Sequence, residues 1–149
     1  MRQMTPDTAL LTGKEQLEKL MQGPGASALG QQLKMRLSEI GDGYAQFIAQ
    51  PDESHYNPGL TLHGGYAATL IDSALGCAVQ TKLPAGVRYG TVELKVNYVR
   101  AVTTANGLLT CRAEVVHAGR SMATAEARVI DASGKLVAHG SGTFMVKQG

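Results

Sequence analysis

The first part of the chain carries two kinds of hydrophobic pattern. In residues 14–21, leucine and methionine side chains recur at helical spacing, which predicts a short helix that ends at Gly23-Pro24-Gly25. Extended patterns follow over residues 32–40 and 43–49. The Gly41-Asp42-Gly43 turn between them predicts a β-hairpin.

Residues 64–80 form the most hydrophobic segment. Small or apolar side chains cover nearly the whole circumference of a helix here, so this helix should be buried. Four stretches of strand type then follow, separated by turn residues: 88–99, 108–117, 121–130 and 136–146. Short connections make them antiparallel neighbours, and their sheet must wrap the helix to bury it. We therefore expect an α+β fold in which residues 1–30 form an extension with a short helix and residues 31–149 form one domain.

The composition is ordinary for a globular protein and excludes several classes. The 149 residues are 44% hydrophobic and 17% charged, with a net charge of +2, and this length allows one domain. Lys and Arg are not clustered into a stripe, so a nucleic-acid partner is not expected. No segment approaches the roughly 18 apolar residues of a membrane span, and residues 1–12 lack a signal-peptide pattern. We expect a cytoplasmic protein with no membrane partner.

Cysteine and histidine spacing gives no metal-binding pattern. Cys77 falls in the apolar helix and Cys111 in a predicted strand, so both are interpreted as reduced packing residues. The histidines are dispersed along the chain: His55, His63, His117 and His139. We expect no metal ion and no redox cofactor.

Asp72 is the sharpest anomaly, because it is the one charged residue on the apolar helix. An ionised carboxylate in such surroundings is costly unless it is paired or hydrated. One explanation is structural: the carboxylate lies at a helix or subunit seam and bonds Ser73 or a neighbouring chain. The other explanation is a general base or nucleophile in a cleft.

The sequence His63-Gly64-Gly65 comes where the central helix must begin. A helix N-terminus offers unpaired N–H groups and the positive end of the dipole, which suit an oxyanion, although paired glycines are also ordinary turn residues. Gly64 and Asp72 are eight residues apart, which is about 12 Å along a helix. One small carbonyl cannot contact both groups. We therefore expect the Gly64 N–H of one subunit to work with Asp72 of another.

The motif Asn57-x5-His63-Gly64-Gly65-x6-Asp72, with the strand Thr91–Tyr98 and Gly119-Arg120-Ser121, resembles a known family. It is similar to hotdog-fold acyl-CoA thioesterases of the phenylacetate-degradation (PaaI-like) type, within the 4-hydroxybenzoyl-CoA thioesterase superfamily. The resemblance covers about residues 31–147. It implies a sheet wrapped around a central helix, homodimers with a continuous sheet, and dimers of dimers.

The resemblance also implies roles for individual residues. Asp72 would activate water or attack the thioester, and the Gly64 N–H would bind the thioester oxygen. Asn57 and His63 would position the carbonyl and its surroundings. Thr91 stands where related enzymes have Ser or Thr near the attacking water, although a strand threonine is also simply a good β-former.

The implied substrate is an acyl-CoA with an aromatic (phenylacetyl-like) or medium-chain acyl group. Coenzyme A is then part of the substrate, and no separate cofactor is needed. Its phosphates would meet Arg88, Arg100 or Arg120 near predicted strand ends, and Arg120-Ser121 fits best because the family often contacts the nucleotide from this hairpin. Further substrate contacts are expected from three residues of the helix, with the partner's N-terminal segment: Gly65, Tyr66 and Leu70.

Two other functions stay open. A hotdog hydratase or dehydratase would act at the β-carbon of an acyl thioester, but its typical His and acid spacings are not visible. A non-catalytic acyl-CoA binding module would have no use for Asp72. Release of free coenzyme A from a panel of acyl-CoAs would separate a thioesterase from both.

Overall fold

The computed structural model describes residues 10–149, so the first nine residues of the predicted extension lie outside the described part. Within residues 10–149, three helices and two 3-10 turns accompany the sheet: α2 (Gly13–Gln22), α3 (Ala28–Gln32), α4 (Gly64–Gln80), η1 (Glu53–His55) and η2 (Thr104–Asn106). The strands are β1 (Met35–Gly41), β2 (Tyr44–Ala49), β3 (Val87–Tyr98), β4 (Leu109–Ala118), β5 (Met122–Ile130) and β6 (Leu136–Gln148). None of these helices is long and apolar enough to cross a bilayer.

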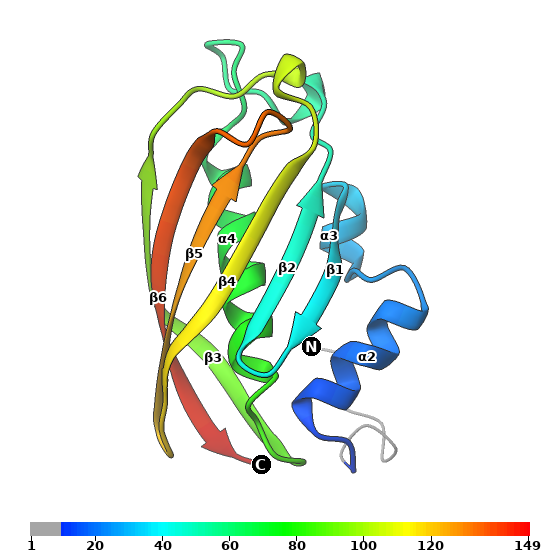
Figure 1. Ribbon diagram of the computed structural model, residues 1–149, viewed down its shortest axis with the longest axis vertical. Coiled ribbons are helices and arrows are strands. Elements are labelled where there is room, and N and C mark those ends of the chain that lie inside the picture. The colour runs from blue at the N-terminus through cyan, green and yellow to red at the C-terminus, as the bar shows by residue number, and fades with distance from the viewer. Residues whose placement is uncertain (1–9) are drawn as a thin grey trace.

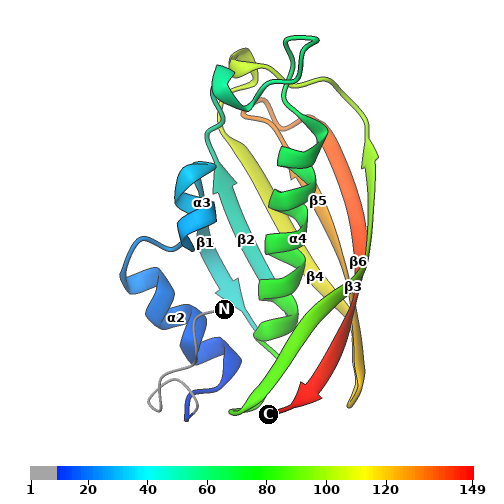
Figure 2. The same ribbon diagram turned by 180° about the vertical axis from the view of Figure 1, so that it is seen from behind.

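The six strands form one antiparallel sheet in the order β1-β2-β4-β5-β6-β3. Figure 1 shows this sheet curving around α4, and Figure 2 shows α4 lying across its concave side. The predicted α+β fold, with an antiparallel sheet around a long central helix and a short N-terminal helix, is confirmed.

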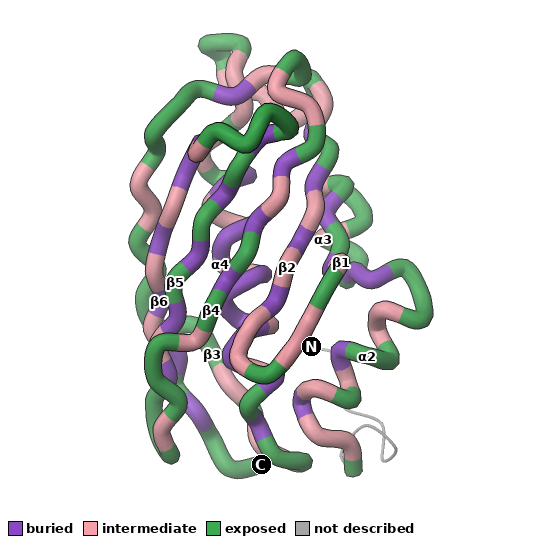
Figure 3. Tube along the Cα trace, in the orientation of Figure 1, coloured by how far each residue is buried: buried purple, intermediate pink, exposed green. Residues whose placement is uncertain are grey.

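The buried face of α4 fixes the helix on the sheet. Leu70, Ile71, Ala74 and Leu75 have no exposed surface. The facing positions of β5 are alternate alanines, which let the helix approach closely, and burial along β5 changes at every residue as the strand period requires. Figure 3 shows the buried positions gathered between sheet and helix. Packing of this kind leaves little freedom for the side chains that α4 presents.

Helix α3 was not predicted, and it shortens the first predicted strand from 32–40 to Met35–Gly41. The Ser27 side chain accepts a hydrogen bond from the Gly30 N–H at 3.2 Å, which caps this helix. Lys34 then adopts a left-handed conformation with φ of 55°, which turns the chain into β1. Five residues are too few to show a helical period, so the pattern of hydrophobic residues gave no signal.

Strand β3 is an edge strand. It pairs with β6 only, and no other strand of residues 10–149 pairs with its outer edge. Its apolar side chains remain exposed, with 53% of Val92 and 57% of Tyr98 accessible. A long exposed edge of this kind is a template for pairing with another chain.

Candidate active site

The predicted catalytic residues fall into two groups on the same chain. Asn57, His63 and Gly64 line a cavity of about 290 Å³ at the start of α4. Asp72 and Thr91 line a separate groove of about 430 Å³ along the middle of the helix. Within one chain, the residues of each group lie together, but the two groups line different cavities.

In the groove, Thr91 contacts Asp72 directly. The Thr91 hydroxyl donates a hydrogen bond to Asp72 Oδ1 at 2.9 Å, from β3 to α4. Asp72 is partly exposed, and its Oδ2 has no partner within residues 10–149. One carboxylate oxygen is therefore held in place while the other is free to accept a proton or to attack.

Two neighbours of Asp72 are held in their neutral forms. Burial raises the pKa of the Cys77 thiol to about 12, and the nearby Asp72 charge adds to the shift. Burial also raises the pKa of Tyr89, with Cys77 and Asp72 contributing. Cys77 and Cys111 are both free thiols. Among residues 10–149, Asp72 is the only carboxylate that lines the groove.

At the start of α4, the Gly64 N–H points to no acceptor in the described part of the chain. The next amide is engaged, because the Gly65 N–H donates to His63 Nδ1 at 2.8 Å. His63 is therefore the N-cap of the helix, and its Nδ1 must be unprotonated to accept this bond. The free Gly64 amide, at the positive end of the helix dipole, can hold an oxyanion.

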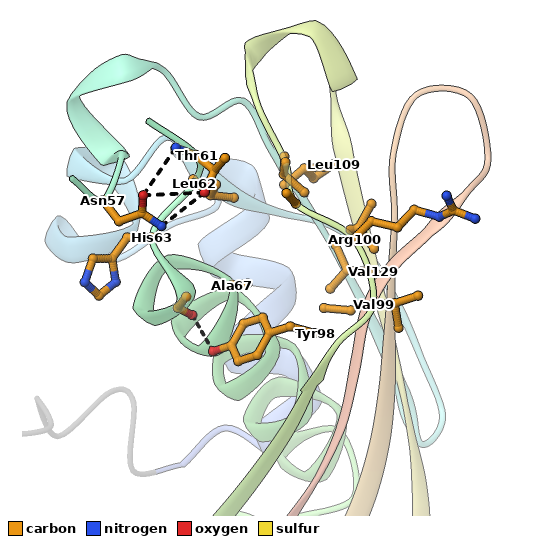
Figure 4. Close-up of a pocket in the computed structure, with 15 residues that line it drawn as sticks. Asn57, Thr61, Leu62, His63, Ala67, Tyr98, Val99, Arg100, Leu109 and Val129 are labelled. Atoms are coloured by element: carbon orange, nitrogen blue, oxygen red, sulfur yellow. Dashed lines mark hydrogen bonds between the residues drawn. The ribbon is translucent and has the colours of Figure 1, made fainter. Parts of the chain in front are cut away.

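Tyr98 is a member of this group that the motif did not single out. Its hydroxyl donates to the Gly64 carbonyl oxygen at 2.7 Å (Figure 4). A Cβ atom at position 64 would lie 3.1 Å from the Tyr98 oxygen, so the close contact favours glycine. Tyr98 ends a strand of alternating apolar and polar residues. Nothing in this pattern distinguishes it from the other strand residues, so its contact with Gly64 could not be predicted.

Asn57 shapes the loop that precedes the helix. Its amide donates to Thr61 Oγ1 at 3.1 Å, and its carbonyl oxygen accepts from the Thr61 N–H at 3.3 Å. Figure 4 shows these bonds beside His63 at the mouth of the cavity. Leu60, at the tip, is held at a φ of 64°. The Asn57 side chain thus closes a tight loop at the edge of the cavity that Gly64 also lines.

The other predicted contact residues lie elsewhere on this chain. Tyr66 is 4% exposed and its hydroxyl donates to the Leu33 carbonyl at 2.6 Å, so in this chain it packs as a core residue. The start of β3, which holds Arg88, and the β4–β5 turn, which holds Arg120 and Ser121, lie at the opposite end of the molecule from the start of α4 (Figure 1).

Arg100 borders the Gly64 cavity, but its guanidinium points away from Asn57 and His63 (Figure 4). Arg88 and Arg120 line neither the cavity nor the Asp72 groove. Contacts between these arginines and coenzyme A stay predictions. Within residues 10–149, no three His, Cys, Asp or Glu side chains gather where they could hold a metal ion.

Comparisons with known proteins identify the family of this chain. The family model described as "Thioesterase superfamily" matches residues 60–138, which is more than half of the chain. A Halobacterium salinarum protein named "Putative esterase VNG_1336C" is 42% identical over 93 residues. That match covers 57% of this chain and 60% of the length of the curated relative.

Solved structures share the whole domain. The conserved protein PA5202 from Pseudomonas aeruginosa is 35% identical, with a TM-score of 0.76 over 83% of this chain and 96% of that one. The PaaI protein of the E. coli phenylacetic acid degradation operon has the same fold, with a TM-score of 0.80 over 94% and 97% of the two chains, at 20% identity. The chain therefore belongs to the thioesterase superfamily and has the hotdog fold of its members.

Proposed function

We propose that the protein is an acyl-CoA thioesterase whose active site is shared between two subunits. The observation that carries this proposal is the separation of two complementary groups. Gly64 offers a free N–H beside one cavity, and Asp72 offers a free carboxylate oxygen in another groove. About 12 Å of helix lies between them, so a second subunit has to supply the missing half.

Strand β3 supports a specific way of pairing the subunits. Its Thr91 contacts Asp72 and its Tyr98 contacts Gly64, so each half-site is tied to one end of the strand. An antiparallel pair of β3 strands, with its two-fold axis between Leu94 and Lys95, would set Thr91 opposite the partner's Tyr98. The Gly64 half-site of each subunit would then lie against the Asp72 half-site of the other, which gives two complete sites in one dimer.

The chemistry follows from these two groups. The Gly64 N–H would hold the thioester oxygen as it becomes an oxyanion, and the helix dipole would strengthen this bond. Asp72 Oδ2 would either take a proton from an attacking water or attack the carbonyl itself. Collapse of the tetrahedral intermediate breaks the carbon–sulfur bond and releases the coenzyme A thiolate. In the first route the attacking water becomes part of the free acid. In the second route the acyl group is left as a mixed anhydride with Asp72, and hydrolysis of this anhydride by water releases the free acid and restores the carboxylate.

Mixing of subunits tests the shared site. Gly64→Pro removes the N–H, and Asp72→Asn removes the charged oxygen, so each homodimer should be inactive. A heterodimer of the two variants has one intact site, so random mixing should restore about a quarter of the wild-type activity. Gly64→Ala is the control, because it adds the same Cβ near Tyr98 but keeps the N–H. No recovery in isolated heterodimers would contradict the shared site.

The outer face of the sheet supports the proposed dimer of dimers. Like charges lie directly opposite each other on neighbouring strands, Arg112 beside Arg128 and Glu114 beside Glu126. Along its own strand, Arg112 pairs with Glu114 at 3.3 Å, so each row of like charges lies next to a row of the opposite charge. Both rows lie along a groove of about 550 Å³. A second dimer turned about an axis parallel to these rows would set arginines over glutamates. The two outer faces are therefore complementary to each other.

Charge reversal tests this second interface. Arg112→Glu with Arg128→Glu should convert tetramers to dimers, because four glutamates on one face then oppose four on the other. Adding Glu114→Arg and Glu126→Arg should restore the tetramer, since the rows are exchanged but still complementary. Light scattering coupled to size exclusion measures the mass. A wild-type protein that remains a dimer at all concentrations would contradict the interface.

A further inference from the structure

The groove beside Asp72 has a floor and two facing walls. Helix α4 supplies the floor, with Asp72, Ser73 and Cys77, and the start of β3 supplies Tyr89 on one side. The opposite wall comes from the α2–α3 segment, residues 13–32, together with β1 and β2. Figure 2 shows α4 flanked by β3 on one side and by α3 on the other. The groove therefore leads from Asp72 toward the N-terminal part of the same chain.

The floor of the groove is less polar than its residues suggest. Ser73 donates its hydroxyl to the Thr69 carbonyl at 2.7 Å, and Thr69 donates to the Gly65 carbonyl at 2.9 Å. Both hydroxyls are thus engaged with the helix backbone. The Cys77 thiol stays neutral, because burial raises its pKa to about 12. Asp72 is the single charged residue that lines the groove.

The facing wall is apolar and fixed in position. It presents Leu20 and Leu29 to the groove, in front of Met35 and Phe47. Leu29 is 55% exposed, so it offers apolar surface that a ligand can cover.

Hydrogen bonds and core packing hold this wall to the domain. The Leu37 N–H donates to the Gly25 carbonyl at 2.7 Å, and the Tyr66 hydroxyl holds the Leu33 carbonyl just after α3. Leu17 anchors α2 in the core with 3% of its surface exposed. A wall fixed in this way can discriminate between ligands by size.

We propose that the α2–α3 segment selects the acyl group, with Leu20 and Leu29 as the residues that limit its length. The lining admits an uncharged, apolar acyl group and disfavours one that ends in a carboxylate, since Asp72 already carries negative charge there. This proposal rests on the thioesterase function proposed above. The segment lies outside residues 60–138, which the family model matches.

Chain-length profiles of matched variants test the proposal. Leu29→Trp should fill the groove, and Ala28→Trp places the same ring one residue away, at an exposed position that does not line the groove. The panel is acetyl-, hexanoyl-, decanoyl-, phenylacetyl- and succinyl-CoA. Because each buried methylene contributes about fourfold, Leu29→Trp should lower kcat/KM for decanoyl-CoA by at least about tenfold and leave acetyl-CoA within about twofold. Leu20→Ala should shift the preference toward longer chains.

Three results would overturn the selecting wall: an equal loss on all chain lengths, the same profile for Leu29→Trp and Ala28→Trp, or succinyl-CoA cleaved as fast as hexanoyl-CoA. Binding of S-alkyl-CoA thioethers, which cannot be hydrolysed, separates this failure from failure of the thioesterase function. If no acyl-CoA is cleaved but Leu29→Trp still weakens the long thioethers selectively, the wall stands and the thioesterase proposal falls. Thioether binding without length dependence overturns the wall.

Discussion

The two half-sites are built in different ways. Around Gly64, residues close in the sequence set most of the geometry: Asn57 closes its loop through Thr61, and His63 caps the helix that Gly64 begins. Around Asp72, the parts come from far along the chain: Thr91 is 19 residues away, and the groove wall comes from the α2–α3 segment. One half-site depends on local structure, and the other depends on the packing of the whole domain.

The difference shows how the fold can change the shape of the Asp72 groove and keep the Gly64 amide site unchanged. A locally encoded amide site tolerates changes elsewhere, because its geometry is set within eight residues. The groove can change shape whenever the N-terminal segment changes, without any change at the amide. In both half-sites, a hydroxyl from β3 completes the arrangement, Thr91 at one end and Tyr98 at the other.

Loss of the carboxylate should have the largest effect. Asp72→Asn keeps the size of the side chain and the contact with Thr91, but removes the base or nucleophile. We expect kcat to fall by about 10³-fold or more, a larger loss than removal of an oxyanion donor. Steady-state kinetics with a thiol-detecting reagent measures it, and the dimer mass is the control. Activity within tenfold of the wild type would contradict the assigned role.

Loss of the Thr91 hydroxyl should have an intermediate effect. Thr91→Val keeps the shape of the side chain but removes the donor to Asp72 Oδ1. Hydrogen bonds to charged groups contribute about 1.5–3 kcal/mol, so kcat should fall by about 10- to 100-fold. Thr91→Ser should recover most of this loss. If serine and valine gave equal rates, Thr91 would be acting only as a strand residue.

Loss of the Tyr98 hydroxyl should have the smallest effect. Its bond to the Gly64 carbonyl joins neutral groups and is exposed, so Tyr98→Phe should cost about 1 kcal/mol or less in unfolding free energy. For a chain of this size, that corresponds to a fall in Tm of about 2–4 °C. Thermal unfolding and kcat are measured on the same samples. A loss of activity larger than that of Thr91→Val would reverse the proposed ranking of the two half-sites.

Local patterns predicted the fold well. The apolar circumference of residues 64–80 placed α4 at its observed bounds, and strand alternation with turn glycines located the hairpins. Because His63, Gly64 and Gly65 are adjacent in the sequence, the start of the helix could also be predicted. Contacts between distant segments were harder, because nothing near Thr91 or Tyr98 indicates what lies opposite each side chain. Helix α3 was missed because its five residues are too few to show a helical period, and its place in the groove wall depends on contacts between distant segments.

The two contacts of β3 have a consequence for how the protein responds to dilution. In the proposed dimer neither half-site acts alone, so catalysis and subunit association would become a single equilibrium, and an isolated subunit would be folded but inactive. Specific activity should then decline as the protein is diluted below its dimer dissociation constant, with no loss of secondary structure. Substrate that bridges two subunits should oppose this decline, so the acyl-CoA would promote the assembly that cleaves it.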